Sequence, residues 1–143
     1  MVSPLLVKAA PTGREIVNVT PERANWAHVG FRAVRLAAGD METVLSGQRE
    51  LCLVVLTGTV SVEIDGQTHA GLGTRDSVFE QISPAAVYVP ASKTVVIRAT
   101  RDAEVALCSA PSDHKARAVR VINPTDMRRS VRGKGTNLRY VCD

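Results

Sequence analysis

The sequence has no apolar stretch near the roughly 18 residues that a membrane-spanning helix needs. Its opening, Met1 to Val7, has no basic lead-in and is followed directly by Lys8, so a secretory signal is not supported. The three cysteines are far apart, odd in number and without CxxC spacing, which argues against a disulfide framework. We therefore expect a cytoplasmic protein with no membrane partner and with reduced thiols, in which Cys52 and Cys108 serve as small core residues.

Histidines are also scarce. The three that occur, His28, His69 and His114, form no HxH or HxxxH pair. His69 follows a predicted hairpin that should place it at the surface. Because metal sites bring several ligands together, isolated histidines favour structural or exposed roles.

Positive charge is concentrated at one end of the chain. From His114 to Arg139 there are eight lysines and arginines against one acid, whereas the preceding residues carry ten basic against twelve acidic side chains. Nucleic-acid sites usually add stacking aromatics or a reading helix to such a run, and this one has only Tyr140 at its edge. A solvated connector is the favoured interpretation, and a nucleic-acid partner is disfavoured.

Short runs rich in β-branched residues, closed by turn residues roughly every 8 to 12 positions, favour an all-β sandwich or barrel over alternating βα units. The length of 143 residues fits one ordinary domain. About eight strands are predicted, as in many small barrels. They cover 14–19, 28–36, 50–56, 59–64, 87–89, 94–99, 103–109 and 118–122.

Two of these runs indicate how the strands pack. A two-residue period points Val60, Val62 and Ile64 to the interior. Asp65-Gly66 then suits a type I′ hairpin turn, because both central positions of that turn need positive φ. The run 50–56 is apolar at nearly every position, which is typical of a strand covered on both sides, so we expect it in the middle of the barrel.

The two ends of the chain are interpreted separately from the middle. Residues 1–25 are expected to form an N-terminal extension with one strand, and residues 26–123 a single barrel. Residues 132–137 are irregular, and 138–143 resemble a strand that starts and immediately stops. We therefore expect 124–143 to be a basic, glycine-containing connector with a truncated strand, leading to a second domain.

The glycine-bounded strand pair and the proline-marked return strand resemble a cupin, an all-β double-stranded β-helix (jelly-roll) barrel. Cupin metal sites come from two motifs, which here would start at Gly39 and Pro90. The four ligand positions fall on Leu45, Gly47, the residue after Glu50, and Val95. Leucine, glycine and valine side chains offer no lone pair to a metal. The barrel of residues 26–123 is therefore predicted to be cupin-like, with no metal and no cofactor of its own.

A wider set of fragments, taken together in their order and spacing over about residues 26–142, resembles one family in particular. The chain is similar to the amino-terminal half of the 5-deoxy-glucuronate isomerase family of bacterial inositol catabolism. The fragments are Val29-Gly30-Phe31, 50–58 with Asp65-Gly66, Val78-Phe79-Glu80, 87–90, 103–106 with Ala110-Pro111, and 132–139.

This resemblance implies a two-cupin protein about twice as long, with histidine and glutamate metal ligands in the carboxy-terminal barrel. The implied reaction converts 5-deoxy-glucuronate into 5-dehydro-2-deoxy-gluconate, an aldose to ketose step that needs a base and a Lewis acid. No catalytic residue is assigned in this chain. Glu50, Tyr88 and Arg98 are the candidates for contacts to a carboxylated substrate.

Three roles follow for the isolated chain. The first is the non-catalytic, metal-free cupin half of a sugar-acid isomerase, whose partner is a second cupin domain or a second copy in a homodimer. The second is a free-standing module for binding a small sugar acid or for dimerisation. The third, nucleic-acid binding through the basic segment, should weaken steeply with salt.

Overall fold

The computed structural model describes residues 6–113 and 115–143. The predictions for His114 and for most of the opening segment lie outside the described residues. The strands are β1 (Glu15–Val19), β2 (Gly30–Leu36), β3 (Met41–Leu45), β4 (Arg49–Thr57), β5 (Val60–Ile64), β6 (Gln67–Leu72), β7 (Ala86–Val89), β8 (Thr94–Ala99), β9 (Ala103–Pro111), β10 (Arg120–Ile122), β11 (Arg129–Arg132) and β12 (Arg139–Cys142). Helical turns are α1 (Pro21–Ala24) and the 3-10 helices η1 (Pro124–Asp126) and η2 (Gly135–Asn137). No helix in these described ranges is long and apolar enough to cross a bilayer.

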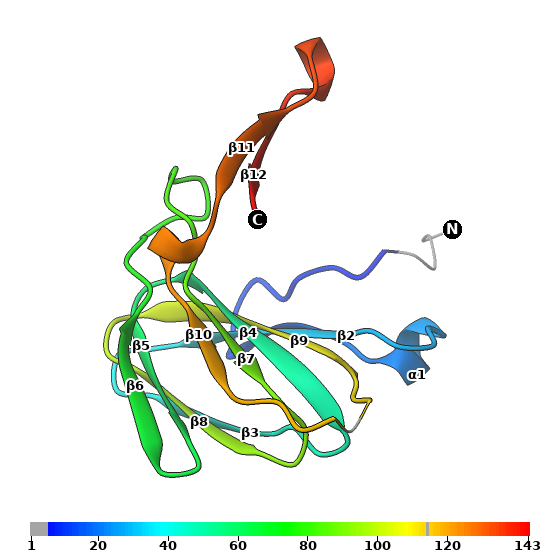
Figure 1. Cartoon of the computed structure of the whole chain (residues 1–143), viewed down its shortest axis with the longest axis vertical. Helices are drawn as coiled ribbons and strands as arrows, with labels where there is room; N and C mark the ends of the chain where they lie inside the picture. Colours follow the sequence, from blue (N-terminus) through cyan, green and yellow to red (C-terminus); the bar gives the residue numbers. More distant parts are fainter. Residues whose placement is uncertain (1–5, 114) are drawn as a thin grey trace.

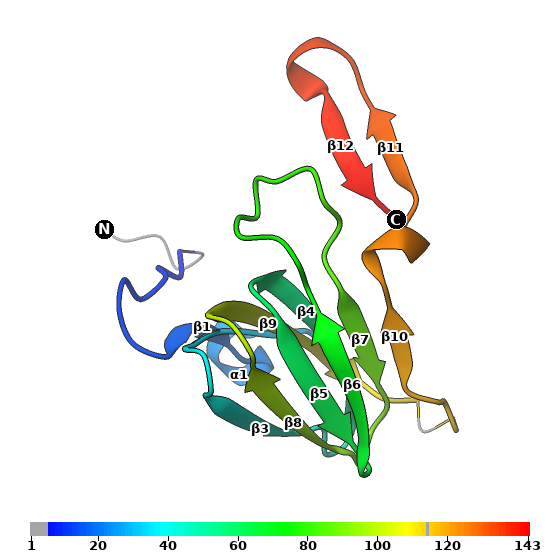
Figure 2. The same cartoon turned by 90° about the vertical axis from the view of Figure 1, so that its left-hand side faces the viewer.

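The strands form two antiparallel sheets that face each other, and a separate hairpin extends from one end (Figures 1 and 2). The larger sheet has the order β1-β2-β9-β4-β7-β10, and the smaller has the order β3-β8-β5-β6. Their inner faces share one apolar core, whose fully buried side chains include Val34, Leu53, Val62, Ile97 and Val105. The predicted all-β, cupin-type jelly-roll barrel is confirmed.

The packing predicted for β5 is confirmed. Val60, Val62 and Ile64 are all buried in the core. Asp65 and Gly66 both have positive φ, 52° and 77°, as the type I′ turn between β5 and β6 requires. Beyond this turn the pairing of β5 with β6 shifts register between Val60 and Val62.

The predicted central position of β4 is right, but the prediction that both of its faces are buried is wrong. β4 lies between β9 and β7 in the middle of the larger sheet. Its inward side chains, such as Leu53, are buried, but the alternate ones are only half-buried on the outer face of the sheet. Cys52 and Cys108 are two of these outer residues and face each other across β4 and β9, so they are not core residues. Strand alternation puts them on the opposite face from the core set.

Several elements were not predicted. β3 and β6 carry few buried side chains and few β-branched residues in an apolar pattern, so their signal is weak. His69 lies within β6 and is half-buried, not at the surface as expected. The strand predicted near 138–143 is β12, and it does not stop unpaired, because β11 pairs with it along its whole length around η2.

Candidate functional site

Two cavities lie at opposite ends of the strands β2, β9 and β4. The pairing of Gly30 with Ser109 marks one end of β2 and β9, and that of Leu36 with Ala103 marks the other. At the first end is the mouth cavity, of about 270 Å³. At the second is a wider end groove of about 710 Å³.

The mouth cavity lies between the two sheets beside α1. Its walls come from β1, β2, β3, β4 and β9 and from the residues leading into α1. The lining combines apolar side chains with a few polar ones. They are Asn18, Val19, Thr20, Pro21, Glu22, Gly30, Phe31, Arg32, Val44, Arg49, Leu51, Leu107 and Ser109.

Arg32 lines this cavity, and its guanidinium is already paired with two carboxylates. Its Nη1 lies 2.6 Å from Glu42 Oε1, and its Nε lies 3.1 Å from Glu15 Oε2. These contacts join β2 to β1 and β3, so Arg32 ties the two sheets together at the mouth.

Arg49, at the start of β4, contacts only neutral groups. Its Nε donates to Ser109 Oγ at 3.0 Å, and its Nη2 donates to the Ser109 carbonyl at 3.1 Å and to the His28 carbonyl. No carboxylate of the described chain lies within 4.0 Å of its guanidinium.

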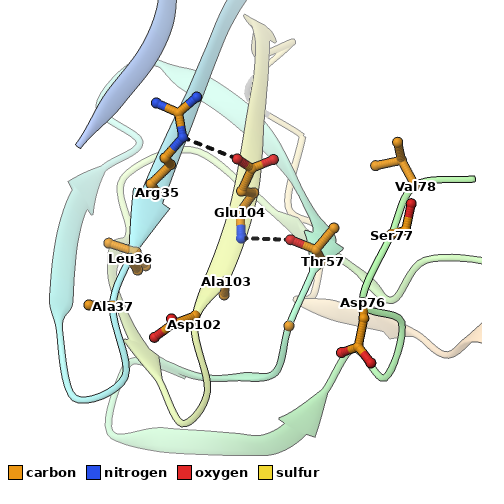
Figure 3. Close-up of a pocket in the computed structure, with 11 residues that line it drawn as sticks. Arg35, Leu36, Ala37, Thr57, Asp76, Ser77, Val78, Asp102, Ala103 and Glu104 are labelled. Carbon is orange, nitrogen blue, oxygen red and sulfur yellow. Dashed lines mark hydrogen bonds and ion pairs between the residues drawn. The ribbon is translucent and has the colours of Figure 1, made fainter. Parts of the chain in front are cut away.

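The end groove is shown in Figure 3, with Asp102 to Glu104 between β2 on one side and Asp76 to Val78 on the other. Glu104 accepts from Arg35 Nε at 3.2 Å, and its backbone N–H donates to Thr57 Oγ1 at 3.2 Å. Asp102 accepts from the Ala38 N–H at 2.8 Å. These charged groups are therefore engaged in holding strand ends and turns.

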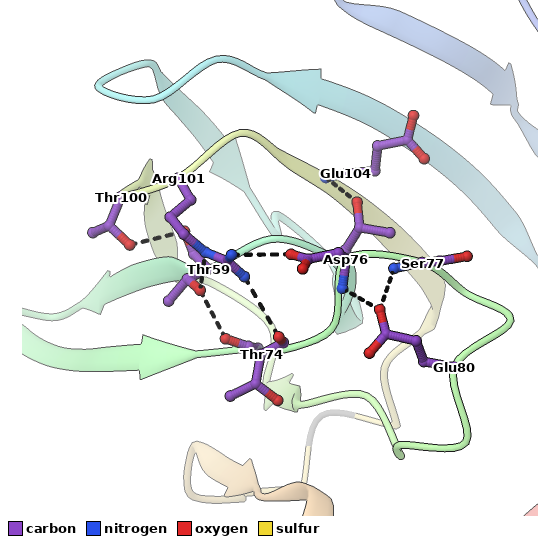
Figure 4. A network of polar contacts seen from close by, with 10 residues as sticks. Thr59, Thr74, Asp76, Ser77, Glu80, Thr100, Arg101 and Glu104 are labelled. Carbon is purple, nitrogen blue, oxygen red and sulfur yellow. Dashed lines mark hydrogen bonds and ion pairs between the residues drawn. The ribbon is translucent and has the colours of Figure 1, made fainter.

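The network at the edge of the end groove fixes the long segment between β6 and β7 (Figure 4). Arg101 pairs with Asp76 at 2.9 Å and donates to Thr59 Oγ1 at 3.1 Å. The Glu80 carboxylate accepts the N–H groups of Asp76 and Ser77 at 2.6 and 2.8 Å. Because these polar side chains bind one another, the end groove serves to hold the segment between β6 and β7 against the neighbouring strand ends.

Two of the predicted substrate-contacting residues meet, but on the outer face of the larger sheet. Tyr88 Oη donates to Glu50 Oε2 at 2.8 Å. Arg117 lies 3.4 Å from the same oxygen and also pairs with Asp113 at 2.6 Å. Burial, and then the bond to Glu50, raises the pKa of Tyr88, while the hydrogen bond from Arg117 lowers the pKa of Asp113. We call Glu50, Tyr88, Asp113 and Arg117 the outer-face cluster.

The third predicted residue, Arg98, is elsewhere. It is exposed on β8, between the buried Ile97 and Ala99, and so lies on the outer face of the smaller sheet. The structure brings Glu50 and Tyr88 together and leaves Arg98 apart.

Comparison with known families draws on the whole chain. The model of the KduI/IolB family matches residues 5–143. The chain belongs to the KduI/IolB family. Two relatives in this family are 5-deoxy-glucuronate isomerases. That of Geobacillus kaustophilus is 36% identical over 126 residues, which are 88% of this chain and 45% of the relative. That of Halalkalibacterium halodurans is 38% identical over 124 residues, or 87% and 46%.

A solved structure agrees with these sequence relatives. An IolB-like protein from Salmonella typhimurium LT2 superposes with a TM-score of 0.90 at 35% identity, over 95% of this chain and 51% of that chain. The chain thus spans about half the length of the KduI/IolB proteins it matches.

The positions that would hold a cupin metal do not fit one in this KduI/IolB chain. Val95 is buried in the core and Leu45 is 73% exposed. The fourth position is the buried Leu51, and the neighbouring Glu50 is engaged by Tyr88 on the outer face. Within the described residues, no group of three or more histidine, cysteine, aspartate or glutamate side chains is placed to bind a metal.

The mouth arginines were missed by sequence reasoning. Arg49 is in phase with the inward Leu51 and Leu53, so the alternation of β4 carries the signal that it points inward. The partners of Arg49 come from residues far away in sequence and could not be read from that alternation.

Proposed function

We propose that this chain is the amino-terminal, metal-free cupin half of a 5-deoxy-glucuronate isomerase-type protein, and that it does not carry out the isomerisation by itself. The reaction would be the aldose to ketose step from 5-deoxy-glucuronate to 5-dehydro-2-deoxy-gluconate in cytoplasmic inositol catabolism. The half itself would serve as a scaffold for a second cupin barrel.

The observation that carries this proposal is the extent of the match. About 88% of this chain aligns with only 45% of an isomerase of the same family. An aldose to ketose conversion needs a base and a Lewis acid near adjacent carbons. In the described residues the ligand positions of the cupin motifs are apolar, buried or engaged elsewhere. We therefore assign the metal-dependent chemistry to the other half of such a protein.

A scaffold role is supported by the surface at the end that bears the hairpin β11–β12. This hairpin stands away from the barrel, and the segment between β6 and β7 extends toward the same end (Figure 2). Large apolar side chains on both are open to solvent, with Phe79 92% and Tyr140 72% exposed. Such a surface fits contact with a second barrel, on the same polypeptide or in a second copy.

The test is an isomerase assay of the purified chain with 5-deoxy-glucuronate, with and without added Mn²⁺, Fe²⁺ or Zn²⁺. The full-length relative from Geobacillus kaustophilus is the positive control. We expect no turnover above that of a blank preparation under any of these conditions. Metal-dependent turnover that co-elutes with the chain in gel filtration would overturn the proposal.

A further inference from the structure

We propose that the mouth cavity binds a small organic carboxylate and that Arg49 is the residue that recognises it. The proposal concerns a site separate from the isomerase chemistry. It does not depend on whether the chain belongs to an isomerase, because binding is measured on this chain alone.

Arg49 is held in place as a recognition group should be. Strand alternation puts its side chain on the inward face of β4, at the open end of the barrel. Three hydrogen bonds to Ser109 and the His28 carbonyl fix the guanidinium through Nε and Nη2. Nη1 has no acceptor in the described part of the chain, so its N–H groups remain to donate to one oxygen of a ligand. A hydrogen bond from this positively charged group to a carboxylate oxygen is charge-assisted and therefore stronger than one between neutral groups.

The charge balance of the mouth cavity singles out Arg49. Arg32 lines the same cavity but is matched by Glu42 and Glu15. Arg49 is half-buried and has no ion-pair partner among the described residues, and a half-buried cation of this kind favours an anion. Glu22 also lines the cavity and is exposed at its edge, where its carboxylate competes with an incoming anion.

The glycine at position 30 keeps this arrangement possible. A Cβ at Gly30 would lie 2.7 Å from Ser109 Oγ and 3.7 Å from Arg49 Nη2. A side chain there would displace Ser109 from Arg49 and fill the cavity beside the guanidinium. The backbone of Gly30 does not need positive φ, so its lack of a side chain is a requirement of space.

The rest of the lining indicates the kind of carboxylate. The cavity of about 270 Å³ is below the usual range for drug-sized ligands, roughly 300 to 1,000 Å³, so the ligand is small. Val44, Leu51 and Leu107 provide an apolar wall, and Asn18 and Thr20 provide polar groups. This combination fits an organic acid with a short carbon body better than an inorganic anion.

The experiment is isothermal titration of the chain with sodium glucuronate and sodium acetate, with glucose and inorganic phosphate as comparison probes. We expect glucuronate to bind more tightly than glucose or phosphate. Arg49→Gln should weaken glucuronate binding roughly tenfold to a hundredfold, as for loss of a charge-assisted hydrogen-bonded pair. The matched control is Arg98→Gln, which removes an exposed arginine of the other sheet and should leave binding unchanged.

Arg49→Gln also removes structural hydrogen bonds, so a second variant is needed. Glu22→Gln leaves Arg49 and its partners in place and removes the competing charge, and we expect it to tighten glucuronate binding. Circular dichroism and thermal melting show whether each variant is folded. Equal binding of glucose and glucuronate, or unchanged affinity in both folded Arg49→Gln and Glu22→Gln, would overturn the proposal.

Discussion

Gly58 and Gly66 offer a controlled comparison of steric fit in the fold. Both have nearly the same positive φ, 78° and 77°. A Cβ at Gly66 would meet nothing within 4 Å, whereas one at Gly58 would lie 2.0 Å from the Asp102 carbonyl oxygen and 2.7 Å from Ala103 Cα. Replacing each with alanine therefore imposes the strain of a positive φ at both sites and a clash at Gly58 only.

The expected magnitudes follow from these contacts. The left-handed conformation costs an alanine about 1 to 2 kcal/mol in both variants. At Gly58 the clash is with backbone, so the β4–β5 turn or the start of β9 must move, which adds about 1 to 3 kcal/mol or more. We expect Gly66→Ala to lower the free energy of unfolding by about 1 to 2 kcal/mol and Gly58→Ala by about 2 to 5 kcal/mol.

Urea unfolding followed by far-ultraviolet circular dichroism measures this difference. With a denaturant dependence of about 1 to 3 kcal/mol/M, the two midpoints should differ by roughly 1 M. Comparable slopes would show that the variants differ in stability and not in the extent of unfolding. Equal midpoints for the two variants would refute the claim that the close approach of Asp102 to Gly58 is what demands a glycine there.

Three further predictions concern titrating side chains on the outer face of the larger sheet. Burial raises the pKa of the Cys52 and Cys108 thiols above the ordinary 9.0, so iodoacetamide at neutral pH should label the exposed Cys142 first, and equal labelling of Cys52 in mass spectra would contradict this. Because these raised pKa values mean that the folded state holds the thiol protons more tightly, their contribution to stability should be lost as pH rises above 9.0 in urea titrations. Glu50→Gln should lower the pKa of Tyr88 toward its ordinary value without reaching it, because burial is the larger cause of the rise. Absorbance at about 295 nm measures this pKa in a background where the other tyrosine is changed to phenylalanine. An unchanged pKa in Glu50→Gln would contradict the prediction.

The strands that could be predicted are those in which apolar and polar side chains alternate regularly along the sequence. β5 and its turn follow from Val60 to Gly66, since alternation and turn chemistry agree there. β6 was missed because Gln67 to Gly71 offers no apolar alternation, and its place is set by pairing with β5. Local sequence carries no information on such pairing.

The candidate site divides in a similar way. The contact between Glu50 and Tyr88 depends on the register of β4 and β7, which sequence reasoning could propose as a pair but not align. The environment of Arg49 depends on β9 and on the segment before β2, far away along the chain. The inward direction of Arg49 was nevertheless available from strand alternation, and the interpretation of 50–56 as covered on both sides obscured it.

The register shift between β5 and β6 has a consequence for how molecules meet at the sheet edge. Between the pairs Val60–Leu72 and Val62–His69, β6 contains one more residue than β5, which makes a bulge in the strand at the edge of the smaller sheet. A bulge interrupts the regular row of hydrogen-bonding groups and twists the strand away from a flat template. The β6 edge is therefore unsuited to adding a strand from another molecule, which protects this edge of the barrel from edge-to-edge aggregation.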